Sequence, residues 1–314
     1  MKKLKVAVIG VGYLGKFHAQ KYAALAETEL VAVVDSYQPH AQTIAQQYYC
    51  EVLQDYRKLI GKVDAVSIVT PTTTHYEISK FFLEHGVHCL IEKPITVTVA
   101  EADSLINIAQ AHQALIQVGH LERFNSAVVA IQDFLHEPKF IESHRIAPFT
   151  LRGTEVDVVL DLMIHDIDLI RFLVKSDIKS IQASGAPVLS EQIDIANARI
   201  EFLNGAVANV TASRAGLKQE RMMRIFQNNA YLSVNLKDKS CSVYRKGSGE
   251  MFPGIPDIHK ESYEFPEDDA IKAEIVAFAD SILNSKPIAV TGEDGKKALE
   301  IAHDITAIVK GQWA

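Results

Sequence analysis

The stretch LKVAVIGVGYLG, residues 4–15, decides the fold of the first half of the chain. Its six opening residues form a near-continuous apolar run, as expected of a parallel strand that is covered on both faces. The run leads directly into G-x-G-x-x-G, in which Gly10 permits a tight turn, Gly12 lets the backbone approach a pyrophosphate, and Gly15 allows the following helix to pack closely. The sequence therefore predicts a phosphate-binding loop that comprises Gly10, Gly12, Tyr13, Leu14 and Gly15.

A second strand, ELVAVVD at 29–35, ends at Asp35. An acidic side chain at this position accepts hydrogen bonds from the ribose hydroxyls of a dinucleotide, and it repels a ribose 2′-phosphate. No arginine follows in SYQPH, so the sequence favours NAD over NADP. The alternative is that Asp35 is only a solvated strand end.

Strands and helices continue to alternate up to residue 119, which predicts an α/β domain with a doubly wound parallel sheet. Ligands bind such sheets outside the carboxyl ends of the strands. TPTTTH at 70–75 and EKP at 92–94 follow two of these ends. A buried strand that finishes on a charged pair indicates a site, although a solvated strand end would also explain it. The residues expected along this cofactor-binding edge are Thr70, Pro71, His75, Glu92 and Lys93.

The composition indicates a globular protein of two domains, which we place at 1–119 and 120–314 because 314 residues can bury more than one core. A formal charge of −7 opposes binding to nucleic acid or to anionic membranes. No apolar run approaches the roughly 20 residues of a membrane span, and no signal peptide is recognisable. The cysteines and histidines lack metal-ligand spacing, so we expect no metal site and three free thiols in a reducing cytoplasm.

Helical periodicity extends over 158–174 in the second half of the chain. Asp161 and His165 are four residues apart and Asp168 follows three later, so a regular helix would carry all three on one face. His165 can act as a base near neutral pH, and Asp161 can orient it or hold a substrate hydroxyl. The alternative is a solvated helix face with an ion pair.

Over essentially its full length, the chain resembles the glucose-fructose oxidoreductase, inositol dehydrogenase and rhizopine-catabolism (Gfo/Idh/MocA) family of NAD(P)-dependent dehydrogenases. The matching features are GVGYLG, Asp35, TPTTTH, EKP and DLMIHDIDL. The resemblance implies that Lys93 and His165 flank the nicotinamide, with Asp161 as the third polar member of the catalytic set. It also implies that 120–314 form an α+β domain with a large, mostly antiparallel sheet. The open face of that sheet would pack against neighbouring subunits in a homodimer or homotetramer.

Two positions depart from the family pattern. Thr72 stands where relatives commonly have Asn, which bears on a cofactor contact. Met163 stands where they often have Gly, which leaves less room beside the helix. Resembling proteins often have a cis peptide at the position of Lys93–Pro94, and the sequence does not decide this point.

Within the family, the chain most resembles the branch that oxidises nucleotide-linked sugars, particularly the UDP-N-acetylglucosamine 3-dehydrogenases of lipid A sugar modification. The segments 118–128, 152–169 and 212–226 carry this resemblance. Their basic side chains suit a diphosphate, although arginines could equally coat an exposed strand, and Asn125 could cap the helix that follows it. The expected substrate-binding residues are Arg123, Asn125, Arg152, Asp161, His165, Arg214, Lys218 and Arg221.

The expected reaction is oxidation of a secondary alcohol on a sugar or UDP-sugar. His165 removes the hydroxyl proton as hydride leaves the carbon for the nicotinamide, while Lys93 stabilises the developing alkoxide. Three alternatives stay open: a free sugar or inositol dehydrogenase, a glycoside hydrolase that reduces and reoxidises NAD within each turnover, and a non-catalytic NAD-sensing protein.

The stretch 245–268 is rich in Gly, Pro and charge, and we interpret it as a long sheet connection or a loop that covers the substrate. Helical periodicity returns at 270–284 and 294–311. We expect these two helices to pack back across the junction between the domains.

Overall fold

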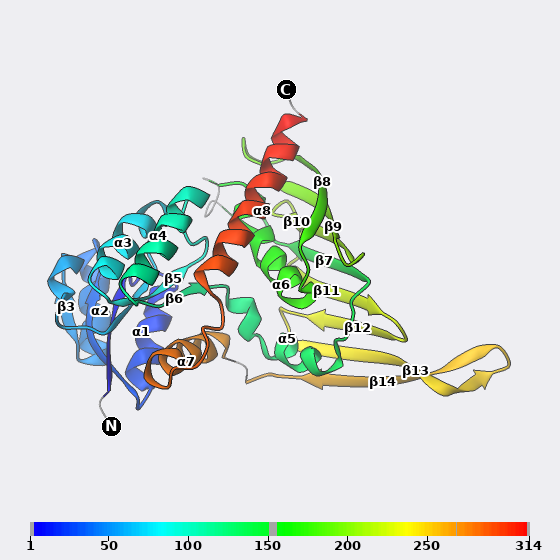
Figure 1. Ribbon diagram of the computed structural model, residues 1–314, viewed down its shortest axis with the longest axis horizontal. Helices are drawn as coiled ribbons and strands as arrows, with labels where there is room; N and C mark the ends of the chain where they lie inside the picture. Colours follow the sequence, from blue (N-terminus) through cyan, green and yellow to red (C-terminus); the bar gives the residue numbers. More distant parts are fainter. Residues whose placement is uncertain (1–2, 151–155, 268, 313–314) are drawn as a thin grey trace. The chain divides into compact units, whose positions relative to one another are not determined.

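The computed structural model describes residues 3–150, 156–267 and 269–312 (Figure 1). The chain divides into two compact units. The first unit consists of Met1–Leu121 and Asp269–Leu299, and the second consists of Glu122–Asp268 and Glu300–Ala314. The boundary near residue 120 lies close to the predicted one, but 269–299 pack with the first unit although we had assigned them to the second. The assignment of cofactor binding to 1–119 and of substrate binding and oligomerisation to 120–314 stays a prediction.

The first unit contains a six-stranded sheet in the order β3-β2-β1-β4-β5-β6, in which every neighbouring pair is parallel. The doubly wound sheet predicted from the sequence is therefore confirmed. Its strands are β1 (Leu4–Ile9), β2 (Thr28–Val34), β3 (Glu51–Leu53), β4 (Ala65–Ile68), β5 (His88–Glu92) and β6 (Ile116–Gly119). The helices are α1 (Gly15–Ala24), α2 (Gln38–Tyr48), α3 (His75–Glu84), α4 (Val99–Ala111), α7 (Ala270–Leu283) and the first part of α8 (Gly292–Gly311).

Close packing at two glycines fixes α1 against the sheet. A Cβ added to Gly15 would lie 1.9 Å from the carbonyl oxygen of Gly10, so only glycine allows the helix to start there. Gly10 itself has φ +84°, and a Cβ there would lie 2.5 Å from the carbonyl oxygen of Val69. Late in the chain, α7 completes the same core, because Ile275 and Phe278 are fully buried in the cluster that contains the β1 and β2 side chains.

The second unit is built on an eight-stranded sheet in the order β14-β13-β12-β11-β7-β10-β9-β8. Only β7 and β10 pair in parallel, so the expected mostly antiparallel sheet is confirmed. Its strands are β7 (Phe140–Ile146), β8 (Ile178–Ala186), β9 (Ile195–Phe202), β10 (Val207–Ser213), β11 (Glu220–Gln227), β12 (Ala230–Asn235), β13 (Ser240–Phe252) and β14 (Ile255–Glu264). The helices α5 (Ser126–Ile131) and α6 (Ile164–Val174) also belong to this unit.

The two faces of this sheet differ, because side chains alternate along each strand. On β7, Ile141, Ser143 and Arg145 are buried and point to the face that α6 covers. The other face carries a row of stacked aromatic rings, with centroid separations of 4.9 to 5.8 Å between cross-strand neighbours. These rings belong to Phe140, Phe226, Tyr231 and Tyr244.

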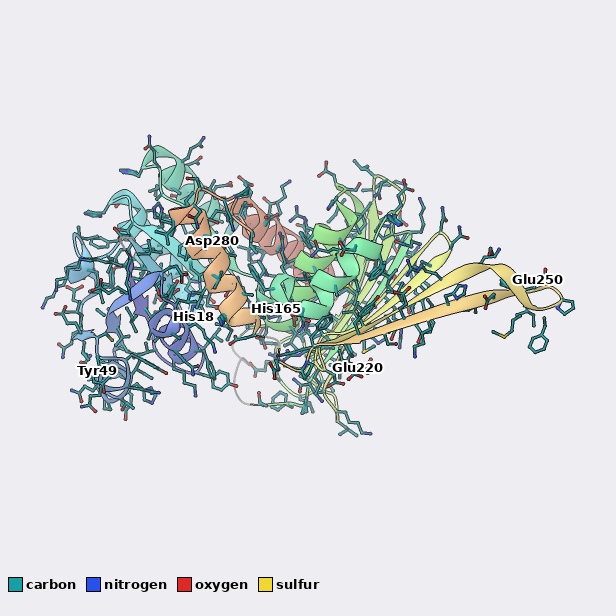
Figure 2. All side chains as sticks on the ribbon, turned by 90° about the horizontal axis from the view of Figure 1, so that it is seen from below. His18, Tyr49, His165, Glu220, Glu250 and Asp280 are labelled. Carbon is teal, nitrogen blue, oxygen red and sulfur yellow. The ribbon has the colours of Figure 1, made fainter. Side chains whose placement is uncertain are left out.

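The prediction of a long sheet connection or a substrate-covering loop at 245–268 is wrong for most of this stretch. Most of these residues continue β13 and form β14, which together make a long antiparallel hairpin. Gly254, with φ +82°, lies in its turn, and Glu250 marks the far end of the hairpin in Figure 2. The Gly and Pro content reflects this turn and the irregular pairing after Lys246. Within the described part of the chain, no helix is both long enough and apolar enough to span a membrane.

Candidate active site

The glycine loop has the shape that a dinucleotide phosphate requires. Backbone hydrogen bonds fix its start, because the N–H of Gly10 donates to the carbonyl of Val34 at 2.8 Å. In contrast to Gly10 and Gly15, a Cβ on Gly12 would meet nothing within 4 Å, so open space lies beside this residue. The first turn of α1 contains no acidic residue and has no side-chain cap, which is the kind of helix start that anions bind. The loop residues therefore fit a pyrophosphate.

Asp35 lies directly beside the glycine loop. Its Oδ2 accepts from the N–H of Val11 at 2.8 Å, and its Oδ1 accepts from the N–H of Tyr37 at 2.8 Å. A carboxylate has about four lone-pair sites, so two backbone donors leave acceptor capacity for ribose hydroxyls. The position and chemistry of Asp35 thus fit the adenosine ribose of NAD.

The turn after β4 begins with Thr70, whose Oγ1 accepts a hydrogen bond from the hydroxyl of Thr74 at 2.8 Å, and continues through the exposed Pro71. The ring of His75 is buried and lies 2.9 Å from both the Thr70 and the Pro94 carbonyl oxygens. Burial lowers the pKa of His75 and outweighs these carbonyls and Glu92, which act in the opposite direction. His75 thus links the segments that follow two strands, and its role as a cofactor contact stays a prediction.

The end of β5 presents Lys93 at the same edge of the sheet. Glu92 Oε2 accepts from the backbone N–H of Lys93 at 3.2 Å, and the Lys93–Pro94 peptide is cis. The Glu92 side chain packs against β6, where a Cβ on Gly119 would lie 3.0 Å from the carboxylate. The strand ends of β1, β2, β4 and β5 thus carry the predicted cofactor-binding residues within one unit.

His165 lies near the start of a helix whose form differs from the predicted one. Instead of one regular helix over 158–174, the chain forms a π-helical turn at Val159–Met163, followed by α6. Asp157 stabilises the start, because its Oδ1 accepts from the N–H groups of Val159 and Leu160 at 3.1 and 3.0 Å. Asp161 lies in the π turn and His165 in the first turn of α6, and both are half-buried. Such turns occur frequently at functional sites.

Asp168, three residues after His165 on α6, is held by an ion pair. Asp168 is buried, and its two carboxylate oxygens accept from Nη2 and Nε of Arg123 at 2.5 and 2.8 Å. The Arg123 guanidinium also lies 4.8 Å from the ring centroid of Phe172. Arg123 therefore holds α6 through this ion pair, and its role as a substrate ligand stays a prediction.

A second buried ion pair holds α6 to the sheet just after His165. Asp166 accepts from Arg145 Nε at 2.5 Å and from the hydroxyl of Ser143 at 2.7 Å, and Arg145 also pairs with Glu122 at 2.8 Å. The two carboxylates that follow His165 in sequence are thus both fixed by arginines. These ion pairs hold the backbone of α6, which carries His165.

Two further candidates have structural partners. Arg214 is buried, with its Nε 2.7 Å from Asp194 Oδ1 and its Nη1 2.8 Å from the carbonyl oxygen of Val156. Burial would raise the pKa of Asp194, but Arg214 and several N–H donors outweigh it and lower that pKa. The Asn125 side chain accepts from the N–H of Ala127 and so caps α5, as the alternative interpretation proposed. Both residues thus have contacts within the protein, and their roles in substrate binding stay predictions.

The predicted basic cluster separates onto two sides of the sheet. Arg221 and Arg224 are three residues apart on β11, so they point to opposite faces. Arg221 pairs across the strands with Arg145 on the face of α6, where burial and Arg145 lower its pKa. Arg224 lies on the other face, 3.8 Å from Glu142. Lys218 is exposed in the turn before β11, and Arg152 lies outside the described residues.

The family models agree with this architecture. A model described as "Oxidoreductase family, NAD-binding Rossmann fold" matches residues 4–120, and a model of the GFO/IDH/MocA C-terminal domain matches residues 110–233. The chain belongs to the GFO/IDH/MocA family of oxidoreductases. The family predicted from the sequence motifs is thereby confirmed, and the chain is an enzyme of the oxidoreductase class with an NAD-binding domain.

Individual relatives support the same assignment over the whole chain. The UDP-N-acetylglucosamine 3-dehydrogenase of Acidithiobacillus ferrooxidans is 38% identical over 311 residues, which cover 99% of this chain and 98% of that protein. A solved structure of that enzyme has a TM-score of 0.93 with 37% identity and covers 99% of both chains. The inositol 2-dehydrogenase of Rhizobium meliloti is 26% identical over 95% of this chain and 94% of its own length.

Proposed function

We propose that this enzyme oxidises the C3 hydroxyl of a UDP-N-acetyl amino sugar, with NAD as the cofactor. Full-length similarity to a UDP-N-acetylglucosamine 3-dehydrogenase carries the proposal, because Lys93, His165 and Asp161 all occupy motif positions in a chain of the same length. The asymmetry of the basic residues supports it further. Arg221 is a partly exposed cation on the α6 face of the sheet, as recognition of a diphosphate requires.

The chemistry needs a proton acceptor and a group that stabilises negative charge. Bound NAD would accept the hydride. His165 takes the proton of the substrate hydroxyl, and Asp161, one turn earlier, orients the imidazole or the sugar. Lys93, positioned at the end of β5, places an ammonium group beside the developing alkoxide. The ion pair of Asp166 holds the helix that carries His165, and the contact from Glu92 holds the backbone of Lys93.

NAD is preferred to NADP because of Asp35. Its carboxylate is fixed beside the glycine loop by the N–H groups of Val11 and Tyr37, so a ribose 2′-phosphate would meet a negative charge that cannot move away. Replacing Asp35 with Ser should narrow the preference for NAD at least tenfold, measured as the ratio of kcat/KM for the two cofactors. An unchanged ratio would contradict this role.

A matched pair of variants tests the nucleotide-sugar assignment. Arg221→Gln removes the cation from the α6 face, whereas Arg224→Gln removes one of equal exposure from the opposite face of the same strand. Since a charge-assisted hydrogen bond contributes about 1.5–3 kcal/mol, Arg221→Gln should raise the KM for UDP-N-acetylglucosamine at least tenfold. Arg224→Gln should change it less than twofold. Equal effects of the two variants, or an equal effect of Arg221→Gln on a free sugar, would contradict the proposal.

We also propose that the enzyme is a homodimer or homotetramer. The aromatic row on the open face of the sheet and the exposed apolar side chains of the β13–β14 hairpin support this, because a face of this kind is typically covered by another subunit. Light scattering of wild type and of a Tyr231→Lys variant measures the oligomeric state, and a monomeric wild type would contradict this proposal.

A 3-keto sugar is a substrate for transamination, and we place the product of the reaction in the supply of amino sugars for lipid A.

A further inference from the structure

Three side chains with metal-binding atoms meet in the interior of the first unit. A ring nitrogen of His18 and one carboxylate oxygen each of Glu92 and Glu274 all lie within 4.8 Å of one another. His18 and Glu274 are each 1% exposed. The residues come from α1, β5 and α7, which are far apart in the chain, so no sequence spacing could reveal the group. His18 is labelled in Figure 2.

Two of the converging polar atoms are buried without a hydrogen bond. His18 Nε2 lies at ion-pair distance, 3.3 Å, from Glu92 Oε1, and neither this nitrogen nor Glu274 Oε1 has a hydrogen-bond partner among the described residues. The edge of a tetrahedron of zinc ligands is about 3.3–3.5 Å, close to the His18–Glu92 separation. With one separation of 3.3 Å and the other two no longer than 4.8 Å, a point equidistant from the three atoms lies about 2 to 2.6 Å from each. These distances fall in the range of metal–nitrogen and metal–oxygen bonds.

Neighbouring groups hold each of the three side chains in place. His18 Nδ1 lies 3.2 Å from the hydroxyl of Ser67, which in turn lies 2.9 Å from the hydroxyl of Tyr22. A partner on Nδ1 leaves Nε2 to serve as the ligand, as in most histidine metal sites. Glu92 accepts from the N–H of Lys93 through its other oxygen. Gln117 on β6 donates to the main-chain carbonyl of Glu274 at 3.0 Å and so fixes α7 beside the group.

The donor set also suits a cation. Two carboxyl groups lie beside one imidazole, Glu274 is buried and Glu92 is half-buried. Buried charges are normally paired or bound to metals. We propose that His18, Glu92 and Glu274 bind one divalent transition-metal ion, of which Zn²⁺ is the type, since one imidazole and two carboxylates suit it better than Ca²⁺ or Mg²⁺. The ion links α1, β5 and α7 and fixes Glu92 beside Lys93.

Metal titration of the full-length protein tests this site without reference to catalysis. After EDTA treatment and dialysis, ZnCl₂ is titrated by calorimetry, and CoCl₂ is followed by visible absorption because tetrahedral Co²⁺ is coloured. We expect one equivalent to bind, and at a hundredfold excess of Zn²⁺ over Kd the thermal midpoint should rise by about 4 °C. Glu274→Gln should weaken binding at least tenfold and abolish the thermal shift.

Two further variants complete the test. His18→Asn removes the nitrogen ligand and should have the same effect, which covers the case in which Glu274→Gln does not fold. His259→Gln is the matched control, because His259 forms an exposed pair with Asp257 at 3.2 Å and should leave binding unchanged. Absence of saturable binding to the wild type would overturn the proposal, as would equal binding by the Glu274→Gln and His18→Asn variants. Either result would mean that a proton and water fill the space.

Discussion

The buried pair of Arg123 and Asp168 gives a quantitative prediction, because the two side chains are only 6% and 1% exposed and share two hydrogen bonds of 2.5 and 2.8 Å. Removing one partner leaves a charge in the interior, which costs about 3–5 kcal/mol. Arg123→Met keeps the apolar contact with Phe172, and Asp168→Leu is similar in size, so the double variant replaces the pair by packed apolar groups. We expect the double variant to lose less than about 1.5 kcal/mol and the coupling energy to exceed about 3 kcal/mol.

Urea unfolding of wild type, both single variants and the double variant measures this coupling, and steady-state kinetics accompany it. If Arg123 is structural, the KM of the double variant for UDP-N-acetylglucosamine should stay within about threefold of wild type, since α6 and His165 keep their place. The reasoning is refuted if Arg123→Met unfolds like wild type but raises KM tenfold or more. That result would keep Arg123 in the substrate-binding set.

Three further predictions concern the first unit and the pH dependence of stability. Gly15→Ala should abolish NAD binding and lower the thermal midpoint, because the added Cβ would lie 1.9 Å from a main-chain oxygen. Gly12→Ala should leave the thermal midpoint unchanged and raise the Kd for NAD at least tenfold. Equal thermal midpoints of the two variants would contradict this prediction. The folded state lowers the pKa of Asp194, so the contribution of Asp194 to stability is complete above about pH 4 and is lost as the pH falls below that value. Chemical unfolding between pH 3 and 5 should show a steeper loss of stability for wild type than for Asp194→Asn. The folded state raises the pKa of Glu274, so the native metal-free protein binds the carboxyl proton of Glu274 more tightly than the unfolded chain does. Its stability therefore falls as the pH rises above about 4. Glu274→Gln should remove this loss of stability, and parallel pH profiles of wild type and Glu274→Gln would disprove the prediction.

The strand ends that carry the candidate cofactor residues could be predicted from the sequence because their signals are local. The turn from Gly10 to Gly15 needs glycine for reasons of backbone geometry, and Asp35 and Lys93 mark strand ends that any parallel sheet brings to one edge. The alternation of strands and helices predicts a parallel sheet, which the structure shows. These features depend on residues within a few positions of one another.

Long-range packing decides what the sequence could not show. The π turn before α6 contains Asp161, so it changes the position of Asp161 relative to His165, whereas His165 and Asp168 keep a spacing of three within the regular helix. The partners of Arg123 and Arg214, namely Asp168 and Asp194, lie 45 and 20 residues away, and nothing in the local sequence distinguishes a paired arginine from a substrate ligand. The alternation of side chains along a strand could have separated the basic residues, since Arg221 and Arg224 must point to opposite faces of the sheet.

The approach of His18 to Glu92 and Glu274 shows the same limit in another way. Histidines and acids that are distant in sequence have no recognisable spacing, and only the topology of the sheet and the return of α7 bring them together. A metal site of this kind is invisible to motif searches, which rely on ligands separated by a few residues.

The central claim is tested most directly by absorbance at 340 nm with purified protein, NAD and a set of substrates that includes UDP-N-acetylglucosamine, free N-acetylglucosamine and inositol. A transaminase with glutamate removes the keto product and draws the reaction forward. We predict that NADH accumulates with UDP-N-acetylglucosamine alone, and that neither Lys93→Ala nor His165→Ala produces it although both bind NAD. NADH formation from inositol or a free sugar but not from the nucleotide sugar would contradict the account, as would full activity of the His165→Ala variant.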